Sequence, residues 1–195
     1  MRHLCRSLVL VLPVVLGVGC TASSSYMRRG GASLAPRRDM ARVVFIRPSE
    51  WPPPNAPTLV DNHGHFIGDC MPQSRFEVSL PPGEYTFIAW SEGTNSLQAN
   101  LAAGKTYYIE VGAVPGVWSA RFYMRAIKPS ARNWPNLQKW MSETTPYEVL
   151  RDQGQEYVGG RKDSVDELIK KGIARFQGYD ATEQQEASLH PEDGT

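Results

Sequence analysis

The chain has little cysteine, and it has no excess of charge of either sign. Its 195 residues include three cysteines and four histidines, and 21 basic residues stand against 20 acidic ones. A nucleic-acid-binding protein is typically marked by a basic footprint, which this balance lacks. We therefore expect no nucleic-acid partner.

The N-terminal apolar run is too short to cross a membrane. Leu8–Val18 has eleven residues, which rise about 16 Å as a helix, roughly half of a ~30 Å hydrocarbon core. Arg2 and Arg6 precede this run and small residues follow it. A basic start, a short apolar stretch and small residues are typical of a secretory signal peptide, which we place at residues 1–19.

Cys20 directly follows Gly19, and this arrangement resembles the lipobox of bacterial lipoproteins. The resemblance implies that Cys20 is diacylated, for example with palmitate, and anchors the mature protein in a membrane. Gly17 stands where the family pattern usually has leucine, so ordinary cleavage after Ala22, giving a secreted or periplasmic soluble protein, stays open. Thr21 is not the aspartate of an inner-membrane retention signal, which implies the periplasmic side of an outer membrane.

Residues 20–40 contain small polar residues, paired glycines and four arginines, without an apolar period. This composition predicts a flexible tether. Fully extended, it would reach about 65 Å. With Cys5 removed and Cys20 acylated, Cys70 is the single remaining thiol, so no internal disulfide can form.

Residues 41–127 carry short apolar or alternating runs separated by turn residues. In Arg75–Leu80 the side chains of Phe76, Val78 and Leu80 share one face, and polar side chains share the other. Such strands recur about every ten residues with no crossover helix between them, which excludes a parallel α/β fold. The pattern predicts a mainly β protein, an antiparallel β-sandwich of about seven to eight strands.

Three stretches of this region, Ala41–Arg47, Leu80–Phe87 and Ala103–Ile109, resemble a domain-of-unknown-function family of small bacterial lipoproteins. The Val60–Gly68 segment resembles the hairpin of that family. The Pro-Gly-Glu-Tyr turn is similar to turns in transthyretin-like and carboxypeptidase-regulatory-like sandwiches. The resemblance implies a lipid-anchored β-sandwich, and it brings no catalytic residues.

Residues 128–178 read as a helical extension, and residues 179–195 as a disordered acidic tail. Val165, Leu168, Ile169, Ile173 and Phe176 form an apolar stripe at helical spacing. This stripe must bury itself against the sandwich or against a partner protein.

Asp61, His63 and His65 are the one set of candidate metal ligands, since carboxylate and imidazole suit Zn²⁺. The Asn62-His63-Gly64 turn between the flanking strands breaks the same-face geometry that such a site needs, so we expect no metal or other cofactor. Cys70 lies at a strand end and reads as a buried, inert thiol. No nucleophile motif or phosphate-binding loop occurs, and we expect no enzyme.

Trp51 stands before three prolines in a stiff loop, where it could contact a sugar or a partner or cover one end of the sandwich. Two interpretations follow. In the first, the chain is a lipid-anchored cell-envelope module that binds a protein or a glycan or serves structurally. In the second, it is an envelope hydrolase accessory with a weak metal site at Asp61, His63 and His65.

Overall fold

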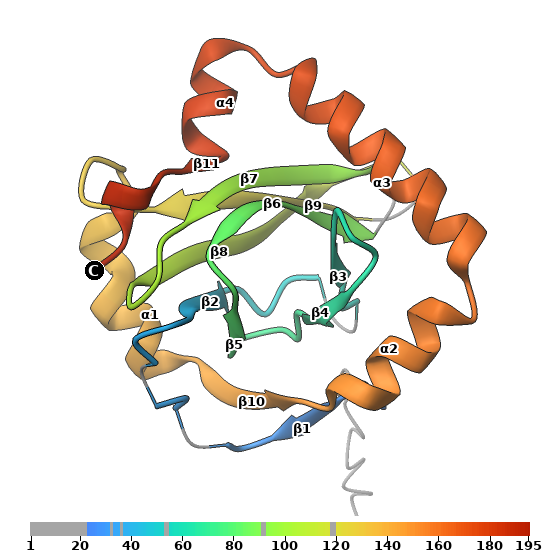
Figure 1. Cartoon of the computed structure of the whole chain (residues 1–195), viewed down its shortest axis with the longest axis horizontal. Coiled ribbons are helices and arrows are strands. Elements are labelled where there is room, and N and C mark those ends of the chain that lie inside the picture. Colours follow the sequence, from blue (N-terminus) through green and yellow to red (C-terminus); the bar gives the residue numbers. More distant parts are fainter. Residues whose placement is uncertain (1–22, 32, 36, 53–54, 91–92, 118–119) are drawn as a thin grey trace, which may run out of the picture.

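A computed structural model describes residues 23–195, apart from positions 32, 36, 53–54, 91–92 and 118–119. Strand residues outnumber helical ones, 39% against 27%, so the fold is mainly β, as predicted. The described segments form two sheets, which together we call the two-sheet body, with helices contributed by the C-terminal third of the chain (Figure 1).

The first sheet has six strands. Their spatial order is β1 (Met27–Arg29), β10 (Thr145–Val149), β5 (Ser74–Leu80), β2 (Ala41–Arg47), β8 (Thr106–Pro115) and β9 (Ala120–Ile127). The second sheet has five strands, in the order β11 (Ser188–Leu189), β7 (Asn95–Leu101), β6 (Gly83–Trp90), β3 (Thr58–Asp61) and β4 (Phe66–Asp69).

Four α-helices and two short 3-10 turns complete the described chain. The helices are α1 (Leu137–Glu143), α2 (Arg151–Gly159), α3 (Lys162–Gln177) and α4 (Ala181–Glu186), and the turns are η1 (Trp134–Asn136) and η2 (Pro191–Asp193). Within the described ranges, no helix has the length and apolar character needed to cross a membrane.

The core lies between the two sheets. The Phe45 ring of β2 stacks on Phe76 of β5 at 5.1 Å and meets Phe87 of β6 edge-on at 5.2 Å. All three side chains are essentially removed from solvent. Aromatic contacts of this kind add to the burial of apolar area, so these rings join the first sheet to the second.

The predicted alternation of β5 is confirmed. Phe76, Val78 and Leu80 are buried in the core, whereas Arg75, Glu77 and Ser79 are only partly buried on the opposite face. Because successive side chains of a strand point to opposite faces, this polar row belongs to the outer face of the six-stranded sheet.

The prediction of a purely antiparallel sandwich of seven to eight strands is wrong in two respects. Both sheets are mixed, with parallel pairs β2–β8, β10–β5 and β11–β7, and the described chain contains eleven strands. The β2–β8 pair needs no crossover helix, because the chain between them passes through β3, β4, β6 and β7 of the opposite sheet and through β5 of the same sheet. The three additional strands, β1, β10 and β11, come from segments outside residues 41–127.

The prediction of a flexible tether over residues 20–40 is also wrong for the part that the structure describes. Met27–Arg29 pairs with β10, and the Ser24 hydroxyl donates to Asp69 Oδ2 at 2.5 Å. Tyr26 packs edge-on against Phe66 with ring centroids 5.7 Å apart. Backbone pairing at a sheet edge needs no apolar period, so composition alone did not reveal it.

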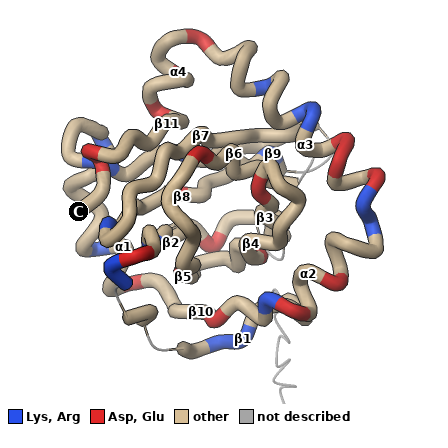
Figure 2. Tube along the Cα trace, in the orientation of Figure 1, with Lys and Arg blue, Asp and Glu red and all other residues tan. Residues whose placement is uncertain are grey.

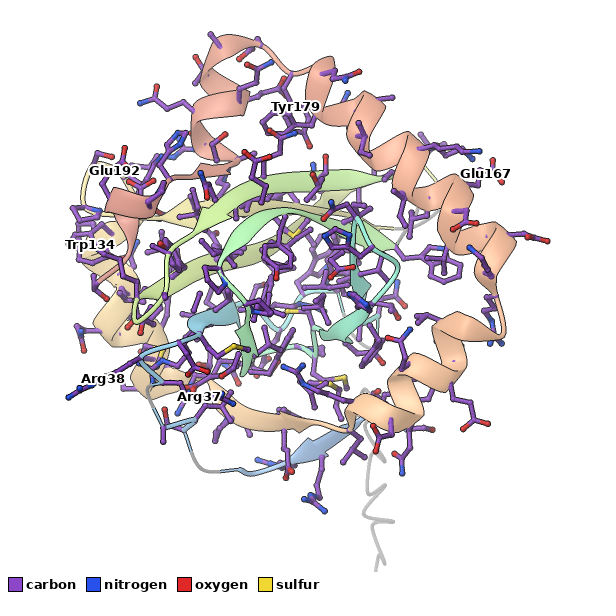
Figure 3. All side chains as sticks on the ribbon, viewed as in Figure 1. Arg37, Arg38, Trp134, Glu167, Tyr179 and Glu192 are labelled. Atoms are coloured by element: carbon purple, nitrogen blue, oxygen red, sulfur yellow. The ribbon has the colours of Figure 1, made fainter. Side chains whose placement is uncertain are left out.

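Residues 179–195 are ordered rather than a disordered tail. Asp180 caps α4: its Oδ1 accepts from the Glu183 amide at 2.8 Å, and Glu183 Oε2 accepts from the Asp180 amide at 3.0 Å. The Thr195 and Thr106 backbones exchange two hydrogen bonds of 3.0 and 2.8 Å. Tyr179, labelled in Figure 3 where α3 passes towards α4, reaches the Ser96 backbone of β7.

The apolar stripe of α3 packs against the five-stranded sheet. Val165 and Leu168 join Val60 and Ile88 in one buried cluster, and the helix follows β6 and β7 (Figure 1). Ile173, by contrast, stays 36% exposed. Of the two alternatives for this stripe, the sandwich or a partner protein, the structure shows burial against the sandwich.

We expect Gly154→Ala in α2 to destabilise the protein by about 1–3 kcal/mol, because a Cβ at this position would overlap the Phe66 ring of β4. Gly159→Ala in the same helix is the matched control, since nothing lies within 4 Å of its Cβ. That variant should be neutral or gain up to about 1 kcal/mol from helix propensity. Urea unfolding followed by circular dichroism measures both, and equal effects would contradict the packing of α2 on β4.

Candidate functional site

A groove of about 660 Å³ opens on the outer face of the six-stranded sheet. The described residues of the segment between β1 and β2 (31, 33–35 and 37–40), which we call the strap, form one wall. Strands β5 and β10 and the first residue of α2 form the rest. The residues that line it include Leu34, Arg37, Met40, Arg75, Glu77, Ser79, Pro146, Glu148 and Arg151.

Glu77 of β5 holds the strap in place. Its carboxylate accepts hydrogen bonds from the Ser33 hydroxyl at 3.0 and 3.1 Å and from the Leu34 amide at 2.9 Å. Arg42 of β2 forms an ion pair with the same carboxylate at 3.8 Å. The polar face of β5 therefore positions the wall of the groove, although the strap is far from β5 in sequence.

Two guanidinium groups of the groove are held by backbone carbonyls. Arg75 donates to the Thr144 carbonyl and hydroxyl, and Arg151 donates to the Ser79 carbonyl at 3.2 Å. Within the described parts of the chain, neither has a carboxylate within ion-pair distance. Because guanidinium has five N–H donors, both groups retain capacity for an external carboxylate or phosphate.

The remaining charges of the groove are already paired. Glu148 of β10 pairs with Arg28 of β1 at 2.5 Å, and Arg37 pairs with Asp39 at 2.7 Å. Figure 3 shows Arg38 pointing away from the body beside Arg37. Over the whole trace the two signs of charge are interspersed (Figure 2), so the two carbonyl-held arginines make the groove locally cationic.

Apolar surface accompanies these charges. Leu34 of the strap is 37% exposed, and Pro146 of β10, paired in register with Arg75, is partly buried on the outer face. Met40 lines the end of the strap. A groove with apolar walls and a few placed polar groups has the chemistry of a ligand-binding surface.

Trp51 does not belong to the groove. It is 44% exposed in the loop that follows β2, and it is absent from the residues that line the 660 Å³ cavity. The buried Arg47 holds this loop, because its guanidinium donates to the carbonyls of Pro52 at 3.0 Å and Asn55 at 2.6 Å. Burial without a carboxylate partner lowers the pKa of Arg47 from its ordinary value.

Asp61, His63 and His65 do come together, but their contacts are those of a turn. Asp61 is buried, and its Oδ1 accepts from the amides of His63 and His65, each at 2.9 Å. Its Oδ2 lies 2.9 Å from His65 Nδ1. The described residues contain no group of three His, Cys, Asp or Glu side chains placed to hold a metal ion.

Cys70 is fully buried, and burial raises the pKa of its thiol to about 12. A thiol that stays protonated at neutral pH is a poor nucleophile. Cys20, the residue predicted to carry lipid, lies outside the described residues.

Comparison of the chain with protein-family models, curated proteins and solved structures finds no match. The groove and the sequence motifs are therefore the features that indicate a function.

No pattern in the sequence indicated Arg151 or Leu34 as site residues. The polar row Arg75, Glu77 and Ser79 was visible in the β5 alternation, and it could have marked the floor of a groove. The walls could not be found in this way, because they come from a segment interpreted as a tether and from a strand, β10, within a region interpreted as helical.

We expect Asp61→Ala to destabilise the protein by about 1–3 kcal/mol, because buried turn amides lose their acceptor. The exposed His63 is the matched control, and His63→Ala should change stability by less than about 0.5 kcal/mol. Thermal unfolding and metal analysis of the purified protein measure both effects. Stoichiometric metal that is lost in both variants would restore the metal-site interpretation.

Proposed function

We propose that the protein is a lipid-anchored binding module of the bacterial cell envelope, without enzymatic activity, that holds an acidic segment of a partner protein in the groove. The observation that carries this proposal is the pair Arg75 and Arg151. Both guanidinium groups border the groove, and both are held by carbonyls rather than by carboxylates. A carboxylate of a partner would complete their charge, and such charge-assisted hydrogen bonds are strong.

A polypeptide suits this groove better than a glycan. Sugar binding commonly uses an exposed aromatic face, and the exposed Trp51 lies outside the groove. The exposed Leu34 and the partly buried Pro146, which is in register with Arg75, instead offer apolar contacts at the sides of the cationic floor. An extended segment with alternating apolar and acidic side chains fits both features.

The anchor is supported by the N-terminal sequence. The signal-like residues 1–19 end at Gly19-Cys20, which resembles a lipobox. The strand and turn motifs that resemble small bacterial lipoproteins point the same way. We propose the periplasmic face of an outer membrane as the location, because Thr21 is not the aspartate of an inner-membrane retention signal.

We expect Cys20→Ser to release the protein from membranes without unfolding it, because the anchor and the core share no residues. Cell fractionation measures the release, and circular dichroism with thermal unfolding of the purified variant checks the fold. A Cys20→Ser protein that still sediments with membranes would contradict the acyl anchor.

We expect a photo-crosslinking residue in place of Leu34 to capture a partner protein in intact cells. The same residue in place of Ile173 is the matched control, because the two side chains are 37% and 36% exposed and Ile173 lies on α3, away from the groove. Mass spectrometry identifies the adduct.

Arg151→Glu should reduce the Leu34 adduct at least about tenfold, since it places a like charge against the acidic segment. Lys170→Glu, an exposed change of the same charge on α3, should leave it unchanged. A Leu34 adduct that is insensitive to Arg151→Glu, or a glycan adduct, would contradict the proposal.

A further inference from the structure

We propose that the end of the two-sheet body that carries Trp51, Val114 and Val117 lies against the lipid bilayer. This inference rests on the proposed acyl anchor at Cys20. It adds an orientation to that anchor: a defined surface of the folded body, and not only the acyl chains, contacts lipid.

Exposed hydrophobic side chains concentrate at this end. The described residues include five large hydrophobic side chains that are exposed, and three of them are Val117 at 84%, Trp51 at 44% and Val114 at 42%. Val114 lies near the end of β8, and Val117 lies in the turn that leads to β9. Tryptophan favours the membrane–water interface, and exposure of a valine side chain to water is unfavourable.

Arg47 links the Trp51 loop to the paired strands β8 and β9, between which Val117 lies. Its Nη2 donates to the Pro52 carbonyl, directly after Trp51, and its guanidinium lies over the Phe122 ring at 5.0 Å from the centroid. Phe122 of β9 is paired with Ala113, the neighbour of Val114. The exposed side chains therefore belong to one end of the body.

The described chain begins near this same end. Ser24 is fixed to Asp69 at 2.5 Å, and the next residue, Cys70, accepts from Arg47 Nη1 at 2.9 Å through its carbonyl. Ser24 follows Cys20 by four residues, which span at most about 14 Å when extended. An acyl group on Cys20 would thus hold this end close to the bilayer instead of allowing the ~65 Å reach expected of a flexible tether.

Positive charge near this end of the body, which we call the tip, is compatible with contact to lipid. Arg121 of β9 is exposed and is paired in register with Val114. A basic side chain beside exposed apolar groups can reach anionic headgroups while the apolar groups enter the interface. A partner protein covering the same tip is the competing occupant, and the test below separates it from lipid.

The test uses the full-length, acylated protein in liposomes of phosphatidylethanolamine and phosphatidylglycerol. A Val117→Cys variant carries an environment-sensitive fluorophore on its single reactive thiol, because Cys70 is buried. Ala103→Cys is the matched control, since this exposed residue lies at the opposite end of β8, whose ten residues span about 33 Å.

With nitroxide-labelled lipids, we expect at least about twofold quenching at position 117 and none at position 103, as a label at the interface would show. Mass spectrometry of the same sample reports acylation. An unmodified Cys20 would overturn the proposed anchor. An acylated protein whose label at position 117 is not quenched, or is quenched no more than that at position 103, would overturn the orientation alone.

In intact cells, a benzophenone attached to the Val117→Cys thiol adds the second measurement. Crosslinking to lipid supports the orientation. Crosslinking to a protein, with no lipid adduct, would overturn it in favour of a protein-covered tip.

Discussion

The buried guanidinium of Arg47 is the contact on which one whole end of the structure depends. It is fully removed from solvent, and it donates to carbonyls from the Trp51 loop and from the end of β4. Its Nε has no hydrogen-bond partner within the described residues, and its face lies on Phe122. Burying a charge costs free energy unless it is hydrogen-bonded, so the three bonds made by Nη1 and Nη2 require the irregular loop to close around this side chain.

Arg47 also helps to place the first described residues of the chain on the body. Cys70, held through its carbonyl, follows Asp69, to which Ser24 is fixed. The start of the described chain is thereby set at a defined place on the body. A short connection from Cys20 would convert the proposed membrane anchor into an orientation.

The groove depends on a second feature, the position of β10 between β1 and β5 in the six-stranded sheet. Because β10 pairs with both neighbours, β1 becomes the edge strand of this sheet. The strap that follows β1 then lies over the outer face. Glu77 then fixes the strap through the Ser33 hydroxyl and the Leu34 amide. The strap and Cys20 belong to one N-terminal segment, so the proposed acyl anchor would hold the proposed partner near the bilayer.

The sequence by itself determined the mainly β class, the two faces of β5 and the apolar stripe of α3. These features depend on side-chain periodicity, which is local and can be read along the chain. Only the tertiary structure decided that residues 27–29, 145–149 and 188–189 are strands, that Asp61 supports a turn, and that Arg151 and Leu34 face one groove. Those outcomes depend on backbone hydrogen bonds at sheet edges and on contacts between distant segments, which leave no period in the sequence.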